Sequence, residues 1–274
     1  MTREIVARAW MGLWYLGYVS LKVILRILIG VERSSWILYI TRIHYIKAYY
    51  GVKFGGIYGW EPHINKIVKK ILKKGLTFID IGAYKGHYTF QAYKILRKKA
   101  NSKIIAIEPF PNNYRILESK FGHNPTVQLL NKAIWIKDEI EVDFYIGDIY
   151  RDGTSATGRI AWSEPHTDNF SLDKTKSVRV KTIRLDTLIK SFNLERVDLV
   201  KMDIQGAEYE ILTDPTLDLS NVCNMIIEVH YKYGSRKSRE IISALARHGF
   251  RIIPLYPEPT LMSYHLLASR LMDP

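Results

Sequence analysis

Residues 78–88 read Phe78-Ile79-Asp80-Ile81-Gly82-Ala83-Tyr84-Lys85-Gly86-His87-Tyr88, and this stretch decides the fold class. An apolar run carries Asp80 near its end, and a turn with Gly82 and Gly86 then leads into a helix-forming segment. Glycine lets the backbone turn sharply and lets a ligand approach it closely, as in the strand–helix turns of nucleotide-binding sheets. The stretch therefore predicts the first strand, turn and helix of an α/β fold.

On both sides of this stretch, short apolar runs alternate with helical patterns, which is typical of parallel βαβ units. We expect strands at 77–81, 103–108, 127–130 with 133–136 as one third-strand region, 140–146 as an antiparallel partner, 178–183, 197–202, 222–229, 250–255 and 266–269. Helices are expected at 61–74, 87–98, 112–121, 186–192, 207–212 and 236–248. The predicted fold is a doubly wound, Rossmann-like α/β sheet with an N-terminal helical extension.

Between two of these strands, residues 147–176 form a polar stretch rich in Gly, Ser, Thr and Asp. Connections of this length inside a compact domain are usually functional or mobile. We interpret the stretch as a lid or an acceptor-recognition segment. A disordered surface excursion is the alternative.

A second carboxylate, Glu108, ends the second predicted strand about 26 residues after Gly82. In a doubly wound sheet, a carboxylate at this place can accept hydrogen bonds from both hydroxyls of a ribose. The dinucleotide fingerprint requires a glycine where Ala83 stands, and the sequence has no phosphate-binding Gly-Lys-Ser/Thr loop. A dehydrogenase and a P-loop nucleotidase are therefore disfavoured.

Composition indicates the cellular compartment of the protein and the partners that its charge would favour. A single cysteine, Cys223, excludes an internal disulfide framework, and the spacings of structural zinc sites are missing, so we expect a cytoplasmic protein. The net charge of +13 can favour phosphate-bearing partners such as nucleic acid, anionic lipid or a diphosphate-linked substrate. A solvated basic surface explains the same charge without any partner.

Residues 1–60 differ from the rest of the chain and are expected to form an amphipathic, aromatic helical segment before a domain at 61–274. One narrow face would carry Arg8, Tyr15, Lys22, Arg26 and Arg33. Lys22 and Arg26 interrupt any membrane span, and no small-residue cleavage site follows Gly30. We expect residues 1–50 to contact an anionic membrane surface, which would place the protein peripherally on the inner membrane face. The alternative is packing on the core or on a second subunit in a homodimer.

Several ordered segments together resemble the FkbM-type methyltransferases, within the class I S-adenosylmethionine-dependent group. The resemblance covers about 75–249 and rests on residues 78–88, 107–114, 131–134, 180–188, 198–208 and 227–230. It implies that 61–274 is a methyltransferase domain and that S-adenosyl-L-methionine is the cofactor. One departure is Gln205, which stands where the family usually carries an acidic residue.

The same resemblance implies a set of cofactor-binding residues. These are Asp80, Gly82, Ala83, Tyr84, Gly86, Tyr88, Glu108, Pro109, Asn131, Ala133 and Asp203. Within this set, Glu108 would bind the ribose, and Asn131 with Ala133 would lie near the adenine.

Polar residues at the ends of two later strands form the expected catalytic set. They are Lys201, Asp203, Glu208, Glu228 and His230. Ligands of open α/β sheets sit at the carboxyl ends of the strands, so these side chains are expected on the acceptor side of the cofactor. A hydroxyl acceptor benefits from a base, or from a divalent metal that Asp203, Glu228 and His230 could hold. Helix capping and loop support are the structural alternative.

Three functions stay open from the sequence. The favoured one is methyl transfer to a hydroxyl of a sugar, glycan or lipid-linked acceptor. RNA methylation would use the basic surface, but the Asn/Asp-Pro-Pro-Tyr/Phe element of amino-group methylation is missing, so nucleic acid is the less favoured partner. A cofactor-binding protein without turnover is the third.

Overall fold

The computed structural model describes residues 62–147, 153–156, 158–160, 176–255 and 263–270. The predicted segment 1–60 and most of the loop 147–176 lie outside the described residues, so contact of residues 1–50 with a membrane stays a prediction. In the described ranges, no helix is both long and apolar enough to cross a lipid bilayer.

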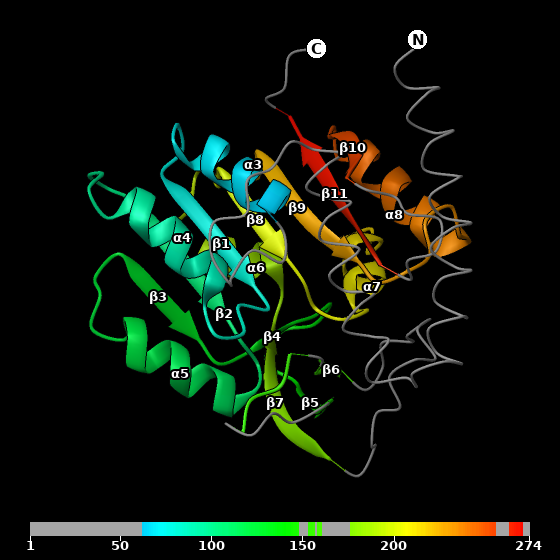
Figure 1. The fold of residues 1–274 in the computed structure, drawn as a ribbon. Helices are drawn as coiled ribbons and strands as arrows, with labels where there is room; N and C mark the ends of the chain where they lie inside the picture. Colours follow the sequence, from blue (N-terminus) through cyan, green and yellow to red (C-terminus); the bar gives the residue numbers. More distant parts are fainter. Residues whose placement is uncertain (1–61, 148–152, 157, 161–175, 256–262, 271–274) are drawn as a thin grey trace, which may run out of the picture. The chain divides into compact units, whose positions relative to one another are not determined.

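A seven-stranded sheet forms the centre of the unit that begins at Ile64. Its strands are β1 (Thr77–Ile81), β2 (Lys103–Ile107), β3 (Val127–Leu130), β8 (Leu199–Met202), β9 (Asn224–Val229), β10 (Arg251–Leu255) and β11 (Tyr264–Ser269). Their order is β10-β11-β9-β8-β1-β2-β3 (Figure 1). β11 runs in the opposite direction to the other six strands. The chain winds outward from β1 in both directions, because β1 pairs with β2 on one side and with β8 on the other. This confirms the doubly wound fold and places its switch point at the end of β1.

Helices cover both faces of this sheet. Helices α3 (Pro62–Leu72), α4 (His87–Leu96) and α5 (Pro111–Phe121) share one apolar cluster with residues such as Phe78, whereas α6 (Leu185–Ser191), α7 (Glu208–Leu212) and α8 (Arg236–Arg247) share the other with residues such as Ile79 (Figure 1). Successive side chains of a strand point to opposite faces, so β1 must be apolar on both sides. All five of its residues are buried.

A second, four-stranded sheet lies in the order β4-β7-β5-β6. Its strands are β4 (Ala133–Ile134), β5 (Glu141–Tyr145), β6 (Arg159–Ile160) and β7 (Ser177–Ile183). The antiparallel partner predicted at 140–146 is present as β5, which pairs with β7 and β6. Two expectations were wrong: the single third-strand region divides between the two sheets, and the loop 147–176 contains a strand, β6.

Asn131 lies where the third-strand region divides. Its side-chain amide donates hydrogen bonds to the backbone oxygens of Glu108 (2.8 Å) and Pro109 (2.9 Å). These bonds hold the chain at the end of β2, where it leaves the large sheet and enters the small one. A run of apolar residues predicts strands but not the sheet to which each belongs.

Candidate active site

A pocket lies at the carboxyl ends of β1, β2 and β8, with residues of the second sheet on its far wall. Six residues of the expected cofactor set line it: Gly82, Tyr84, Glu108, Pro109, Ala133 and Asp203. The other five members, Asp80, Ala83, Gly86, Tyr88 and Asn131, do not line it. Six of the predicted residues therefore form part of the pocket wall, and the other five lie outside it.

Gly82 brings the turns after β1 and β8 into contact. Its backbone φ is +75°, and a Cβ added there would lie 1.8 Å from the carbonyl oxygen of Asp203. The backbone N–H groups of Gly82 and Ala83 both donate to the carbonyl oxygen of Ile107 at 3.0 Å, and the N–H of Asp203 donates to that of Ile81 at 3.0 Å. Only glycine fits this position, and the three strand ends are fixed against one another.

Glu108 presents a buried carboxylate to the pocket. One oxygen accepts from the backbone N–H of Tyr84 at 2.8 Å. The other accepts from the backbone N–H of Phe110 at 2.9 Å and from the Asn113 amide at 3.2 Å. Burial raises the pKa of Glu108 to about 7, although these hydrogen bonds act in the opposite direction. A carboxylate has about four acceptor positions, so the side chain keeps capacity for a hydroxyl of a ligand.

Asn113 connects Glu108 to the described part of the long loop. Its amide nitrogen also donates to the backbone oxygen of Ser155 at 2.7 Å, and its oxygen accepts from the backbone N–H of Ser155 at 3.1 Å. The Tyr84 hydroxyl lies 3.4 Å from that of Thr154. Because Ser155 lines the pocket, Asn113 fixes one wall of it. The sequence reading gave Asn113 no role, although it lies only five residues after Glu108.

Two supporting residues explain the shape of the turn after β1. Asp80 is buried and accepts from the hydroxyl of Thr89 at 2.6 Å. Burial raises its pKa to about 6. Gly86, at φ +81°, has no room for a Cβ, which would lie 2.7 Å from Leu117 and 2.9 Å from Phe121. Asp80 thus ties β1 to α4, and Gly86 lets α5 pack closely against the start of α4.

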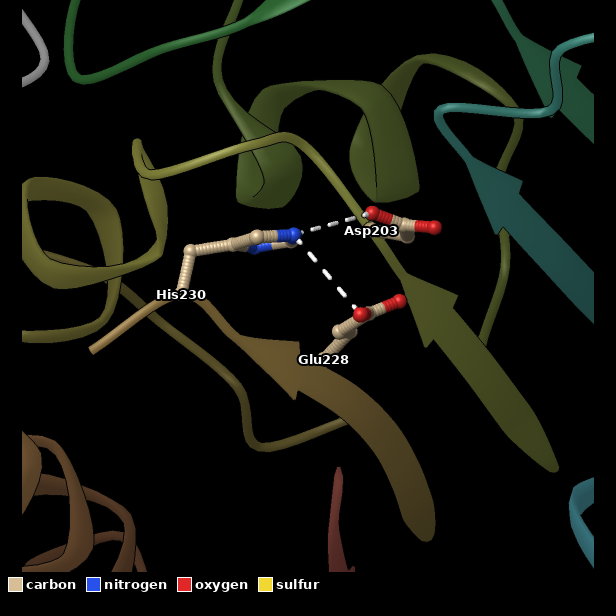
Figure 2. A group of neighbouring side chains, drawn as sticks. All are labelled: Asp203, Glu228 and His230. Atoms are coloured by element: carbon tan, nitrogen blue, oxygen red, sulfur yellow. Dashed lines mark ion pairs between the residues drawn. The ribbon is translucent and has the colours of Figure 1, made fainter. Parts of the chain in front are cut away.

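The structure brings together four members of the expected catalytic set. Asp203 follows β8, Glu208 begins α7, Glu228 lies in β9 and His230 follows that strand. The imidazole Nε2 of His230 lies 3.8 Å from Asp203 Oδ1 and 3.8 Å from Glu228 Oε1 (Figure 2). We call these four residues the acceptor-side cluster. Of the four, only Asp203 also lines the pocket, so it joins the two sites.

Glu208 holds the ring of His230 in one orientation. Its Oε1 accepts from His230 Nδ1 at 2.8 Å and from the backbone N–H groups of Gly206 at 3.1 Å and Ile204 at 3.3 Å. Burial disfavours the charged imidazolium. The charge and the hydrogen bond of Glu208, with the charges of Glu228 and Asp203, nevertheless raise the pKa of His230 to about 10.

Lys201 and Gln205 flank Asp203. The Lys201 ammonium is buried, 3.6 Å from Asp203 Oδ2 and 5.1 Å from the centre of the Tyr88 ring. Gln205, at the position where the family usually carries an acidic residue, donates to Asp203 Oδ1 at 3.1 Å. Both side chains therefore orient the carboxylate that the pocket and the cluster share.

His265 supports Glu228 from the neighbouring strand. It is buried in β11 directly opposite Glu228, and its Nε2 lies 3.6 Å from Glu228 Oε2. The hydroxyl of Ser263 donates to the other oxygen of Glu228 at 3.2 Å. No local pattern predicts this contact, since it depends on β11 pairing with β9.

Comparison with known proteins gives one match to a described family and two curated relatives. The pattern of the family "Methyltransferase FkbM domain" matches residues 80–252, which is more than half of the chain. The "AMB antimetabolite synthetase AmbE" of Pseudomonas aeruginosa is 28% identical over 66% of this chain and 10% of its own length. The "2-O-methyltransferase NoeI" of Sinorhizobium fredii is 25% identical over 54% of this chain and 60% of its own. The chain thus spans less than two thirds of either relative.

Among solved structures, the chain is similar to the methyltransferase FkbM from Methylobacillus flagellatus. The two are 12% identical, with a TM-score of 0.41 over 71% of this chain and 43% of that one.

Proposed function

Because the chain belongs to the FkbM methyltransferase family, we propose that it transfers the methyl group of S-adenosyl-L-methionine to a hydroxyl oxygen of a sugar, glycan or lipid-linked saccharide. One observation carries the proposal: Asp203 belongs both to the wall of the pocket and to the acceptor-side cluster. The relative named as a 2-O-methyltransferase supports oxygen as the accepting atom.

The polar groups and the backbone turn that line the pocket fit the cofactor. Glu108 would hold the ribose, because its fixed and buried carboxylate can accept from neighbouring hydroxyl groups. The turn at Gly82 lets the cofactor approach the backbone closely, since no side chain stands there. S-adenosylmethionine supplies an activated methyl group on a positively charged sulfur. The protein therefore needs only to align the acceptor oxygen, the methyl carbon and the sulfur, and to receive a proton.

The transfer balances without any further reactant. The acceptor oxygen forms a bond to the methyl carbon, the carbon–sulfur bond breaks, and its electron pair remains on the sulfur. The hydroxyl proton passes to the acceptor-side cluster, where Asp203 is the carboxylate nearest the pocket. Lys201 and Gln205 would keep that carboxylate facing the acceptor.

An isotope-transfer experiment tests the proposal. The full chain is incubated with S-adenosylmethionine carrying a labelled methyl group and, separately, with saccharide, lipid-linked saccharide and RNA fractions. Label in a methyl ether of a saccharide is the expected result, whereas label confined to RNA would overturn it. Asp203→Asn should lower turnover strongly, because its contribution belongs to the transition state.

A further inference from the structure

We infer that Asp203, Glu228 and His230 form a binding site for one divalent transition-metal ion such as Mn²⁺. One ligand atom from each residue lies within 4.8 Å of the other two (Figure 2). Carboxylate oxygens suit Mn²⁺ and imidazole suits the later first-row metals, so this mixed set favours a divalent ion of that row. The role of the ion in catalysis rests on the proposed function, but its binding does not.

The spacing of the three groups fits an ion better than direct contacts. At 3.8 Å, His230 Nε2 is too far from Asp203 Oδ1 and Glu228 Oε1 for hydrogen bonds. Donors bonded to one such ion at about 2.0–2.2 Å lie at most about 4.4 Å apart. An ion between the groups would therefore reach all three ligand atoms with only small adjustments of the side chains.

The orientation of His230 is the second argument. A metal-binding histidine usually donates its other ring N–H to a carboxylate, which fixes the ring. Glu208 makes this contact at 2.8 Å and is itself fully buried and held by backbone N–H groups. This built support distinguishes the site from a chance group of acidic residues on a surface.

The position of the ion would serve the proposed reaction. Asp203 lies on the pocket wall, so an ion on it would stand at the acceptor side. A hydroxyl bound to a divalent cation has a lower pKa and gives up its proton more readily.

Binding of Mn²⁺ to the full chain, without cofactor or acceptor, tests the inference. The protein is freed of metal with a chelator, and free Mn²⁺ is followed by electron paramagnetic resonance during a titration. We expect one ion per chain. Asp203→Asn and His230→Asn should each weaken binding at least about tenfold, and Glu208→Gln about 10–100-fold. Glu240→Gln is the matched control, since Glu240 bonds to Tyr209 and Arg236, outside the cluster.

Two results would overturn the inference: no binding at millimolar Mn²⁺, or binding that all three variants leave unchanged. Circular dichroism of each variant excludes loss of fold as the cause of weaker binding. The Mn²⁺ titration of the wild-type protein tests the inference even where a variant does not fold. Variant-sensitive binding without methyl transfer to any acceptor would refute the proposed function and keep the metal site.

Discussion

The substitution Gly82→Ala should damage the cofactor pocket more than any ordinary glycine replacement. A left-handed residue other than glycine costs about 1–2 kcal/mol of stability. The new Cβ would also lie 1.8 Å from the carbonyl oxygen of Asp203, where ordinary contact begins at 3.4 Å. The turns after β1 and β8 must therefore move apart, which strains the hydrogen bonds between the ends of β1, β2 and β8.

The size of the effect follows from these contacts. Losing two of the three hydrogen bonds costs about 0.5–1.5 kcal/mol each, so the total is about 2–5 kcal/mol. Gly249→Ala is the matched control. Its φ is +81°, and a Cβ there meets only Arg270 Nε, at 3.9 Å. The control therefore carries the strain of the left-handed backbone, about 1–2 kcal/mol, without the collision.

Urea denaturation of both variants gives the free energy of unfolding, and calorimetric titration with S-adenosylhomocysteine gives the affinity. We expect Gly82→Ala to lose at least about 1 kcal/mol more than the control. Its affinity should fall at least about tenfold, whereas that of the control should stay close to wild type. Equal losses of stability, together with unchanged affinity in Gly82→Ala, would refute the reasoning.

Three further substitutions test other parts of the structure. Burial raises the pKa of Glu108 from 4.5 to about 7, so the folded state binds this proton more tightly and wild-type stability should fall as pH rises through that window. Glu108→Gln should remove this dependence, which amounts to about 3 kcal/mol, and parallel pH profiles from urea denaturation would contradict it. Asn113→Ala should cost about 1–3 kcal/mol and speed proteolysis near Ser155, because the loop loses both amide contacts; unchanged cleavage would count against the link. The carboxylate of Asp198 is buried, but hydrogen bonds from backbone N–H groups and Arg196 hold its pKa below its usual value. The ionised side chain therefore stabilises the folded state above that usual value, and this stabilisation is lost as pH falls. Asp198→Asn should therefore destabilise at neutral pH more than near pH 3, and equal losses at the two pH values would exclude this.

The large sheet and the turn after β1 could be predicted because their signals are local. Asp80, Gly82 and Gly86 lie within seven residues, and the conformation of that turn depends on glycine itself. The predicted elements end within a residue or two of the observed ones in most cases, since apolar periodicity follows burial. The meeting of Asp203 with Glu228 followed from a general rule, that strand ends of a parallel sheet lie at one edge.

What the sequence did not show depends on contacts between distant segments. The third-strand region divides where the side chain of Asn131 bonds to the end of β2, and His265 is buried opposite Glu228, which lies on another strand. Asn113 acts through the backbone of Ser155, which lies across a long connection. None of these contacts alters local periodicity, so residue patterns alone cannot reveal them.

The place of β11 in the sheet has a consequence for synthesis on the ribosome. β10 is made before β11, yet in the described structure it joins the sheet through β11. The nascent chain must therefore leave the edge of β9 open while β10 emerges, and β10 must not pair directly with β9. Ser263 and His265 reach Glu228 only after β11 has docked. The contacts at the ends of β1 and β2 can therefore form earlier in translation than the contacts of Glu228 with β11.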